Sequence, residues 1–348
     1  MTRFGFVVHP LNDFQSRVYG VRTLDPKLFL HAHHKTLAPS RIALPSLTTI
    51  NETLSGCLVS LPNQSSELLE DQVFGVQQVV KAVEVCQENR CTVVGLGGVA
   101  AMIGGQGKAV SKAVDLPVTS GNHLTAETAF QTTLRALHVL EPKKASVALV
   151  GLPSPVGLLI LRLLNEFGIA CEVVSRTPPR PLQRQTDALT QASGVPIQFA
   201  ESLSETRSKI VIAASSTGMR LPLSSLPPHR LYIDVAAPAD IEMDSTRDDV
   251  AVIDGEYLSP PNPLTGDLWQ RIYGLITRQP DALLACFVEP MLIALSGKFT
   301  LCGVGRNLEV QKARQLGELA TAYGFIVDRL YRFGYPIDEA KLRKKLGH

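Results

Sequence analysis

The sequence has little net charge and no hydrophobic stretch long enough to cross a bilayer. The formal net charge is +2, which argues against a protein dedicated to binding nucleic acid. The longest apolar run, residues 283–295, contains Glu289 and Pro290 and is shorter than a membrane-spanning helix. The apolar start of the chain is interrupted by His9 and Pro10, unlike a secretory signal peptide. We therefore expect a cytoplasmic protein whose contact with a membrane is at most peripheral.

Recognisable metal-binding patterns are also lacking. The six cysteines are scattered, and their spacings match neither a zinc site nor a Cys-x-x-Cys redox pair. Scattered cysteines of this kind fit a reducing compartment. His31, His33 and His34 cluster without a neighbouring carboxylate or cysteine, so we interpret them as an exposed helix end. The sequence thus predicts no metal centre.

The most informative pattern present is a strand, a glycine turn, a helix and a second strand over residues 146–176. Residues 147–150 form a short apolar run typical of a strand buried on both faces of a parallel sheet. Gly151 ends this run, and the helix expected after Gly157 carries a broad leucine-rich face. Residues 171–174 read as the second strand. This order predicts the βαβ unit in which a nucleotide phosphate binds at the helix N-terminus, close to both glycines.

The details of this unit favour NADPH as the cofactor. Its loop, which includes Val156, has Ser154 where the usual pattern has its middle glycine, and a small side chain there still lets a pyrophosphate approach. After the second strand, where NAD enzymes carry an acidic residue, the chain has Ser175, Arg176 and Thr177. A hydroxyl beside a guanidinium suits a 2′-phosphate. The alternative is an ordinary βαβ unit without a ligand, with Arg176 as a solvated surface residue.

Three further strands complete the predicted cofactor domain, which we place at residues 143–257. Ala214 and Ser215 follow the first of these strands, and small residues there suit contact with a nicotinamide ribose or phosphate. Asp234 ends the next strand and is included among the expected cofactor contacts. The three strands are expected at residues 209–214, 231–235 and 250–253.

A second glycine-rich loop, residues 95–107, competes for the role of cofactor loop. Several of its glycines break the helix that would receive a pyrophosphate, so we expect this loop to shape a substrate pocket instead. The next helix, expected over residues 125–140, begins beside His123. A helix N-terminus offers N–H groups and positive charge, which makes His123 a candidate general acid or polar orienter. The alternative for His123 is a capping or surface histidine.

The full chain is predicted to be an α/β protein with three regions. Its 348 residues, 45% of them hydrophobic, suffice for two domains. We expect an N-terminal α/β substrate-binding domain, a central Rossmann-type parallel sheet that binds NADPH, and a C-terminal helical region with a helical tail from residue 326 on. The three regions are placed at residues 1–142, 143–257 and 258–348.

Segments spread over residues 95–325 resemble the cyanobacterial long-chain acyl-[acyl-carrier-protein] reductases. The order and rough spacing of these segments agree with that family, of which the chain would be a divergent member. The Ala-Cys-Phe and Gly-Arg-Asn segments are the more specific marks. The segments are Leu96-Gly97-Gly98, Thr119-Ser120-Gly121-Asn122 with Thr125-Ala126, Val150-Gly151 with Gly157, Ala285-Cys286-Phe287 with Met291-Leu292, and Gly305-Arg306-Asn307 with Gly317-Glu318.

The resemblance implies NADPH-dependent reduction of a fatty acyl thioester to an aldehyde through an acyl-enzyme at Cys286. It also implies acyl carrier protein or acyl-CoA as the partner that delivers the acyl group, and a downstream enzyme that consumes the aldehyde. A reactive thiolate needs a positive group nearby. His123, Lys298 and Arg306 are the candidates for that task. The chain departs from the family pattern at Ser154 and in the position of His123 directly after Gly-Asn.

Two other functions stay open. A dehydrogenase of the shikimate type shares this two-domain layout and needs a lysine–aspartate pair, for which Lys35, Lys81 and Lys108 are available in the N-terminal region. The chain could also be a non-catalytic NADP(H)-binding or regulatory protein, an alternative motivated by the departures at Ser154 and His123. Taken by itself, Cys286 within its apolar segment is typical of core packing.

Overall fold

The computed structural model describes residues 2–9, 39–48, 52–142, 145–216, 218–236, 238–262 and 282–347. The chain is a mixed α/β protein, as the sequence predicted, and it divides into two compact units. The histidine cluster at residues 31–34 and Lys35 lie outside the described residues. Unit 1 comprises Met1–Leu124, Pro260–Leu308 and Gln315–Ile326, and unit 2 comprises Thr125–Ser259, Glu309–Arg314 and Val327–His348.

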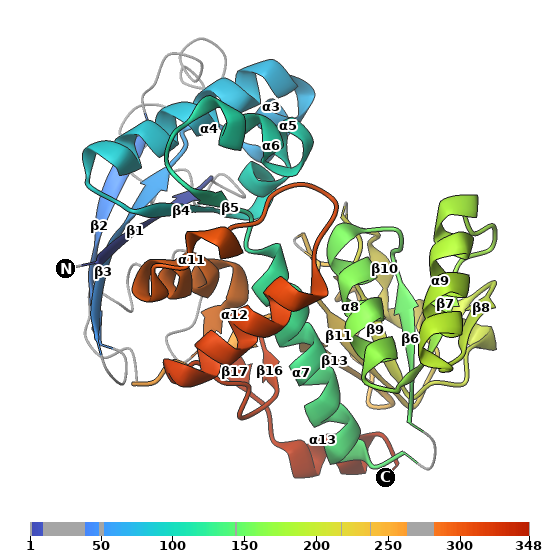
Figure 1. Cartoon of the computed structure of the whole chain (residues 1–348). Coiled ribbons are helices and arrows are strands. Elements are labelled where there is room, and N and C mark those ends of the chain that lie inside the picture. The colour runs from blue at the N-terminus through green and yellow to red at the C-terminus, as the bar shows by residue number, and fades with distance from the viewer. Residues whose placement is uncertain are drawn as a thin grey trace. The chain divides into compact units, whose positions relative to one another are not determined.

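Unit 1 is built on a five-stranded sheet in the order β2-β3-β1-β4-β5 (Figure 1). In this sheet β1 runs parallel to β3 and β4, β5 runs parallel to β4, and β2 runs antiparallel to β3. The strands are β1 (Thr2–Val8), β2 (Ser40–Thr48), β3 (Thr53–Ser60), β4 (Val93–Leu96) and β5 (Val118–Thr119), and the short β15 (Leu283–Leu284) also belongs to this unit.

Side-chain alternation along β1 decides which helix covers each face of this sheet. Phe4 and Phe6 both meet Phe287 of α11 (Ala285–Ser296) edge to face, with ring centroids 5.6 and 4.9 Å apart. Gly5, between them, faces Cys86 of α4 (Gln72–Glu88). Because successive residues of a strand point to opposite faces, α4 and α11 lie on opposite faces of the sheet (Figure 1).

The glycine-rich loop after β4 contains short, interrupted helices. Gly104 and Gly105 have φ values of 59° and 72° inside α5, which confirms that these glycines break the helix. No helix in the described part of the chain is long and apolar enough to cross a membrane. The other helical segments of unit 1 are α3 (Ser65–Glu70), η1 (Gly98–Ala101), α5 (Ile103–Gln106), α6 (Lys108–Ala113) and η4 (Phe299–Leu301).

Unit 2 is built on an eight-stranded sheet in the order β17-β16-β13-β11-β9-β6-β7-β8 (Figure 1). Its six parallel strands, counted along the chain, lie in the order 3-2-1-4-5-6, which is the order of dinucleotide-binding sheets. They are β6 (Ser146–Val150), β7 (Ala170–Val174), β8 (Ile197–Ala200), β9 (Ile210–Ala213), β11 (Arg230–Asp234) and β13 (Val250–Asp254). The structure therefore confirms the Rossmann-type parallel sheet.

The remaining elements of unit 2 cover or extend this sheet. Two segments cross from one unit to the other, because α7 (Asn122–Leu140) begins in unit 1 and α12 (Val310–Ala322) is divided between the units. The other helices are α8 (Pro155–Glu166), α9 (Arg180–Ser193), η2 (Leu203–Glu205), η3 (Leu223–Ser225) and α13 (Glu339–Lys345), and the short strands are β10 (Leu221–Pro222), β12 (Ile241–Glu242), β14 (Tyr257–Leu258), β16 (Tyr331–Arg332) and β17 (Tyr335–Pro336).

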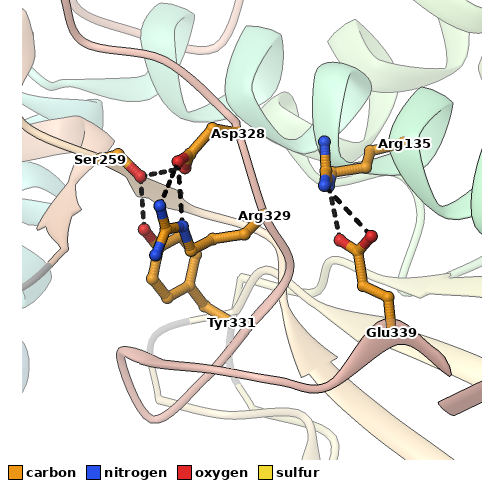
Figure 2. Close-up of polar contacts among 6 residues, drawn as sticks. All are labelled: Arg135, Ser259, Asp328, Arg329, Tyr331 and Glu339. Atoms are coloured by element: carbon orange, nitrogen blue, oxygen red, sulfur yellow. Dashed lines mark hydrogen bonds and ion pairs between the residues drawn. The ribbon is translucent and has the colours of Figure 1, made fainter. Parts of the chain in front are cut away.

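Polar contacts hold the C-terminal segment to unit 2 (Figure 2). Arg135 in α7 forms a bidentate ion pair with Glu339 of α13, with N–O distances of 2.6 and 3.1 Å. Ser259, after β14, donates a hydrogen bond to Asp328 and forms another with the hydroxyl of Tyr331. These contacts fix the last residues of the chain on the same unit as the parallel sheet.

Two predictions about the C-terminal region are wrong. The expected helical tail from residue 326 on instead contains the antiparallel pair β16–β17, which extends the sheet at β13, before α13 begins. The expected separate region 258–348 is shared between the two units. The domain boundary expected at residue 142 is instead found between Leu124 and Thr125, in the first turn of α7. α11 joins unit 1 because nearly all its side chains are apolar and buried, so it needs the β1 face to cover it.

Candidate functional site

Cys286 lies in the first turn of α11, where the positive end of the helix dipole is located. The helix begins at Ala285 and contains Pro290 within it. Cys286 is half-buried, while nine of the ten residues that follow it, from Phe287 to Ser296, are buried. The preceding residue, Leu284, makes no side-chain cap hydrogen bond to this helix end.

The loop before α7 packs directly against Cys286. A Cβ placed on Gly121 would come within 2.5 Å of both the Cα and the Cβ of Cys286. Gly121 also has a φ of +76°, a conformation that residues with a side chain rarely adopt. Glycine is therefore required at this position for two independent reasons, and its backbone forms the wall beside the thiol-bearing residue.

Glu289, one helical turn after Cys286, holds this loop in place. Its side chain is fully buried and accepts hydrogen bonds from the Thr119 hydroxyl and from the Leu124 N–H, the latter at 2.8 Å. The backbone N–H groups of Gly121 and His123 also donate to it. Burial raises the pKa of Glu289 to about 7, against the opposing effect of these donors.

The role of Glu289 was not predicted from the sequence, in which this residue only interrupts an apolar run. The available signal was a carboxylate within an otherwise apolar helix, because a buried acidic side chain must be satisfied by donors from elsewhere in the fold.

His123 belongs to the same loop and is covered by the segment after α11. It is buried, and a Cβ on Gly303 would lie only 2.2 Å from its Cε1 and 2.4 Å from its Nδ1, so this edge of the imidazole lies against the Gly303 backbone. Ser120 fixes this contact, since its N–H and its hydroxyl both donate to the Gly303 carbonyl at 2.9 Å. His123 is thus a buried residue of the Cys286 surroundings, not a surface histidine.

The two cationic candidates are placed differently. Lys298 follows the C-terminal end of α11, so a helix of about 15 Å separates it from the first-turn cysteine. Lys298 is therefore not the group beside the Cys286 thiol, and that prediction is wrong. Arg306 is exposed and comes three residues after Gly303, in the segment that covers His123.

The lysines weighed for a shikimate-type site are not brought together with a carboxylate. Lys81 is exposed on α4, and Lys108 is exposed at the start of α6 with its aliphatic chain against Gly305. Neither makes an ion pair with an aspartate among the residues that the structure describes. The observed geometry gives that alternative no support from these two residues.

In unit 2, the loops after β6 and β9 meet at the point where the strand order reverses. Gly151 has a φ of +95°, and a Cβ on it would lie 2.6 Å from the backbone nitrogen of Ser215. Ala214 and Ser215 directly follow β9. Such a reversal point is where parallel α/β sheets bind their ligands, so the structure brings these three predicted cofactor residues together as expected.

Ser154 has a different task from the glycine it replaces. Its hydroxyl caps α8 by accepting a hydrogen bond from the Gly157 N–H at 3.0 Å, and it donates to the Ala214 carbonyl. A Cβ on Gly157 would lie 2.7 Å from that hydroxyl oxygen. Since Pro155 has no N–H, the Val156 N–H is the donor in the first turn that meets no acceptor in the described chain.

The side chains of Ser215 and Asp234 are engaged with the protein itself. Asp240 accepts hydrogen bonds from the N–H and the hydroxyl of Ser215, the first at 2.7 Å. Asp234 accepts from the N–H groups of Ala236, Asp240 and Ile241 at 3.0–3.2 Å, and burial raises its pKa to about 6. These side chains order the loops at the sheet edge, whereas the sequence predicted direct contact with the cofactor.

Ser175, Arg176 and Thr177 lie at the carboxyl end of β7, where a ribose-binding group is expected. The Ser175 N–H donates to the Ala200 carbonyl, which ties the turn to the end of β8. Arg176 and Thr177 are exposed, and the Arg176 guanidinium has no acceptor within the described ranges. The tight turn at Gly151 and the exposed guanidinium fit NADPH, while the Ser154 cap removes one of the N–H donors that a pyrophosphate would use.

Comparison with known proteins finds a relative that is similar to nearly the whole of this chain. No model of a known protein family matches the chain. Over 363 aligned positions the chain is 28% identical to aminotransferase PigE of Serratia sp. (strain ATCC 39006), an alignment that covers 98% of this chain and 41% of PigE. The chain therefore spans less than half the length of the curated relative it matches.

Several solved structures share remote similarity. L-tryptophan dehydrogenase from Nostoc punctiforme is 12% identical, with a TM-score of 0.37 over 92% of this chain and 80% of that one. Shikimate dehydrogenase from Mycobacterium tuberculosis is 13% identical, with a TM-score of 0.31 over 92% of this chain and 100% of that one. At these TM-scores the likenesses assign no activity, cofactor or substrate to this chain.

Proposed function

We propose that this chain is an oxidoreductase that reduces a fatty acyl thioester to an aldehyde, with Cys286 as the acyl carrier and NADPH as the hydride donor. The observation that carries this proposal is the arrangement around Cys286. The half-buried Cys286 lies in the first turn of a buried helix, with the Gly121 backbone packed against its Cα and Cβ and the loop fixed by Glu289. A cysteine that served only as core packing would need no such fixed loop beside it.

The reaction requires a thiolate nucleophile and a protein surface that positions the acyl group. The Cys286 sulfur attacks the thioester carbonyl, forms a new thioester, and releases the pantetheine thiol, which takes up a proton. The dipole of α11 favours the thiolate, and the rigid Gly121 backbone restricts where the acyl group can lie. NADPH would supply a hydride to the carbonyl carbon of the acyl-enzyme, so that the aldehyde leaves and the thiolate returns.

In this proposal unit 2 binds the cofactor through the loops after β6, β7 and β9. The strand order, the left-handed Gly151 and the exposed Arg176 support it. The Arg176 guanidinium is the group that would select a 2′-phosphate, and the Val156 N–H is the donor that would meet a pyrophosphate.

The partner that delivers the acyl group would be an acyl carrier protein or CoA, and another enzyme would consume the aldehyde. PigE, which carries a segment similar to this chain within a protein more than twice as long, is named an aminotransferase. Transamination needs a carbonyl compound as the amino-group acceptor, and an aldehyde is one. We therefore infer that the aldehyde made here is the substrate of an amino-group-transferring enzyme.

Intact-mass spectrometry after incubation with acyl-carrier and acyl-CoA thioesters tests the first half of the reaction. The wild-type chain should gain the mass of one acyl group, and Cys286→Ser should gain none while binding NADPH as before. Cys302→Ser is the matched control, because Cys302 is the other half-buried cysteine of unit 1 and should leave the adduct unchanged. An adduct that persists in Cys286→Ser would remove Cys286 from the proposal.

The second half is tested by adding NADPH or NADH to the isolated acyl-enzyme. Aldehyde formation with NADPH, and its loss in Arg176→Ala with NADPH but not with NADH, is the expected result. NADPH binding without any acylation would instead support a non-catalytic binding protein. Oxidation of a cyclic hydroxy acid by Cys286→Ser would support the shikimate-type alternative.

A further inference from the structure

Three cysteines that lie far apart in the sequence meet in the core of unit 1. Cys57 comes from β3, Cys86 from α4, and Cys91 from the turn just before β4. Their sulfur atoms all lie within 4.8 Å of one another, and the Cys57 and Cys91 sulfurs are 3.5 Å apart. All three side chains are buried. We call Cys57, Cys86 and Cys91 the thiol cluster.

The strand between them leaves the space that the cluster occupies. In the sheet register, Gly5 of β1 pairs with Cys57 on one side and with Val94 on the other. A Cβ on Gly5 would lie 2.6 Å from the Cys86 sulfur. The missing side chain at Gly5 therefore lets the Cys86 thiol of α4 approach the sheet closely, near Cys57 of β3 and Cys91 of the turn before β4.

The backbone does not suit a disulfide between Cys57 and Cys91. β3 and β4 lie on opposite sides of β1, and the Thr92 N–H, next to Cys91, bonds to the Arg3 carbonyl of β1. Two strand spacings separate the flanking backbones by about 9.5 Å. A disulfide tolerates Cα separations only up to about 6.8 Å. The Cys57 and Cys91 side chains therefore converge from β3 and from the turn before β4, as ligands of a shared ion do.

We propose that Cys57, Cys86 and Cys91 bind a thiophilic metal ion, which pins β3, α4 and β4 together. A metal about 2.3 Å from each of three sulfurs in a plane holds them about 4.0 Å apart, within the spread seen in the cluster. Thiolate ligands select ions such as Zn²⁺ and Cu(I). The described part of the chain adds no histidine or carboxylate to this set.

The charge around the cluster fits a bound ion. The side-chain Nε of Arg3 is buried and has no hydrogen-bond partner in the described chain, and its positive charge acts on both Cys57 and Cys91. Three thiolates and one divalent cation carry a single net negative charge, which the Arg3 guanidinium balances. Arg3 is half-buried, and its buried Nε next to three neutral thiols would have no counter-charge among them, whereas the thiolates of a bound ion supply one.

Metal analysis of the full-length protein, purified without chelator, tests the proposal. About one equivalent of metal per chain should be found, and the element identifies Zn²⁺ or copper. Cys57→Ala, Cys86→Ala and Cys91→Ala should each lose this metal. Cys171→Ala is the matched control, since Cys171 is an equally buried cysteine of β7 in unit 2, and should retain it.

A metal titration of the wild-type chain, after its metal has been removed with a chelator, tests the proposal even if the variants fail to fold. Cd²⁺ or Co²⁺ should produce thiolate-to-metal charge-transfer absorption with an intensity that corresponds to three thiolates, and Zn²⁺ or Cu(I) should raise the melting temperature by several degrees. A chain that is purified without metal, gives no charge-transfer band and melts at the same temperature with each ion would overturn the proposal. So would a metal content in all three variants that equals the metal content of the wild-type chain.

Discussion

In unit 2 the candidate cofactor loop comes mainly from one contiguous stretch, residues 146–176, whereas in unit 1 the surroundings of Cys286 come from three separated segments. Residues 119–124, Cys286 with Glu289, and Gly303 meet only in the folded chain. The first arrangement depends on local turn and helix geometry. The second depends on one buried carboxylate and two glycines, so single substitutions should affect unit 1 more strongly than unit 2.

The largest effect is expected for Glu289→Ala. The substitution removes the acceptor of the Thr119 hydroxyl and of backbone N–H groups in a fully buried place, so it should lower the free energy of unfolding by about 3–5 kcal/mol. Glu289→Gln keeps the shape and one acceptor oxygen and should cost less. Urea unfolding measures both, with Glu84→Gln on the exposed face of α4 as the control. An unchanged midpoint for Glu289→Ala would show that the loop does not depend on this carboxylate.

A smaller but still large effect is expected for Gly121→Ala. The new methyl group meets the Cys286 backbone, and the residue is forced to keep a positive φ, which together should cost about 2–4 kcal/mol. Gly168→Ala is the matched control, because Gly168 also has a positive φ but has open space where the Cβ would lie. The difference between the two melting temperatures therefore isolates the contact with Cys286. Equal shifts would mean that this contact carries no cost.

The smallest effect is expected for Ser154→Gly. Loss of the cap and of the bond to the Ala214 carbonyl should lower stability by about 1 kcal/mol. The same change frees the Gly157 N–H, so NADPH should bind a few-fold more tightly by fluorescence titration. Ser154→Ala serves as the control, since it removes the cap but leaves a side chain beside Gly157. Weaker binding by Ser154→Gly would show that the cap itself orders the cofactor loop.

The sequence allowed more to be predicted for unit 2 than for unit 1. The βαβ unit, the strands β9, β11 and β13 and the positions of Ser175 to Thr177 were predicted from apolar runs and glycines, which act locally. The strand β8 was not predicted, because residues 197–200 form a largely exposed strand without a clear apolar pattern. The hydrogen bonds of Ser154, Ser215 and Asp234 could not be predicted, because their partners lie up to 60 residues away.

The sequence alone determined the parallel sheet, the left-handed turns and the apolar α11, because each follows from the residues within one short segment. Tertiary structure alone decided which distant groups surround Cys286 and that Cys57, Cys86 and Cys91 meet beneath α4. The physical reason is that a buried polar or sulfur atom is satisfied by whatever the fold brings within hydrogen-bond or bonding distance. That set of neighbours is fixed by strand order and helix packing rather than by spacing along the chain.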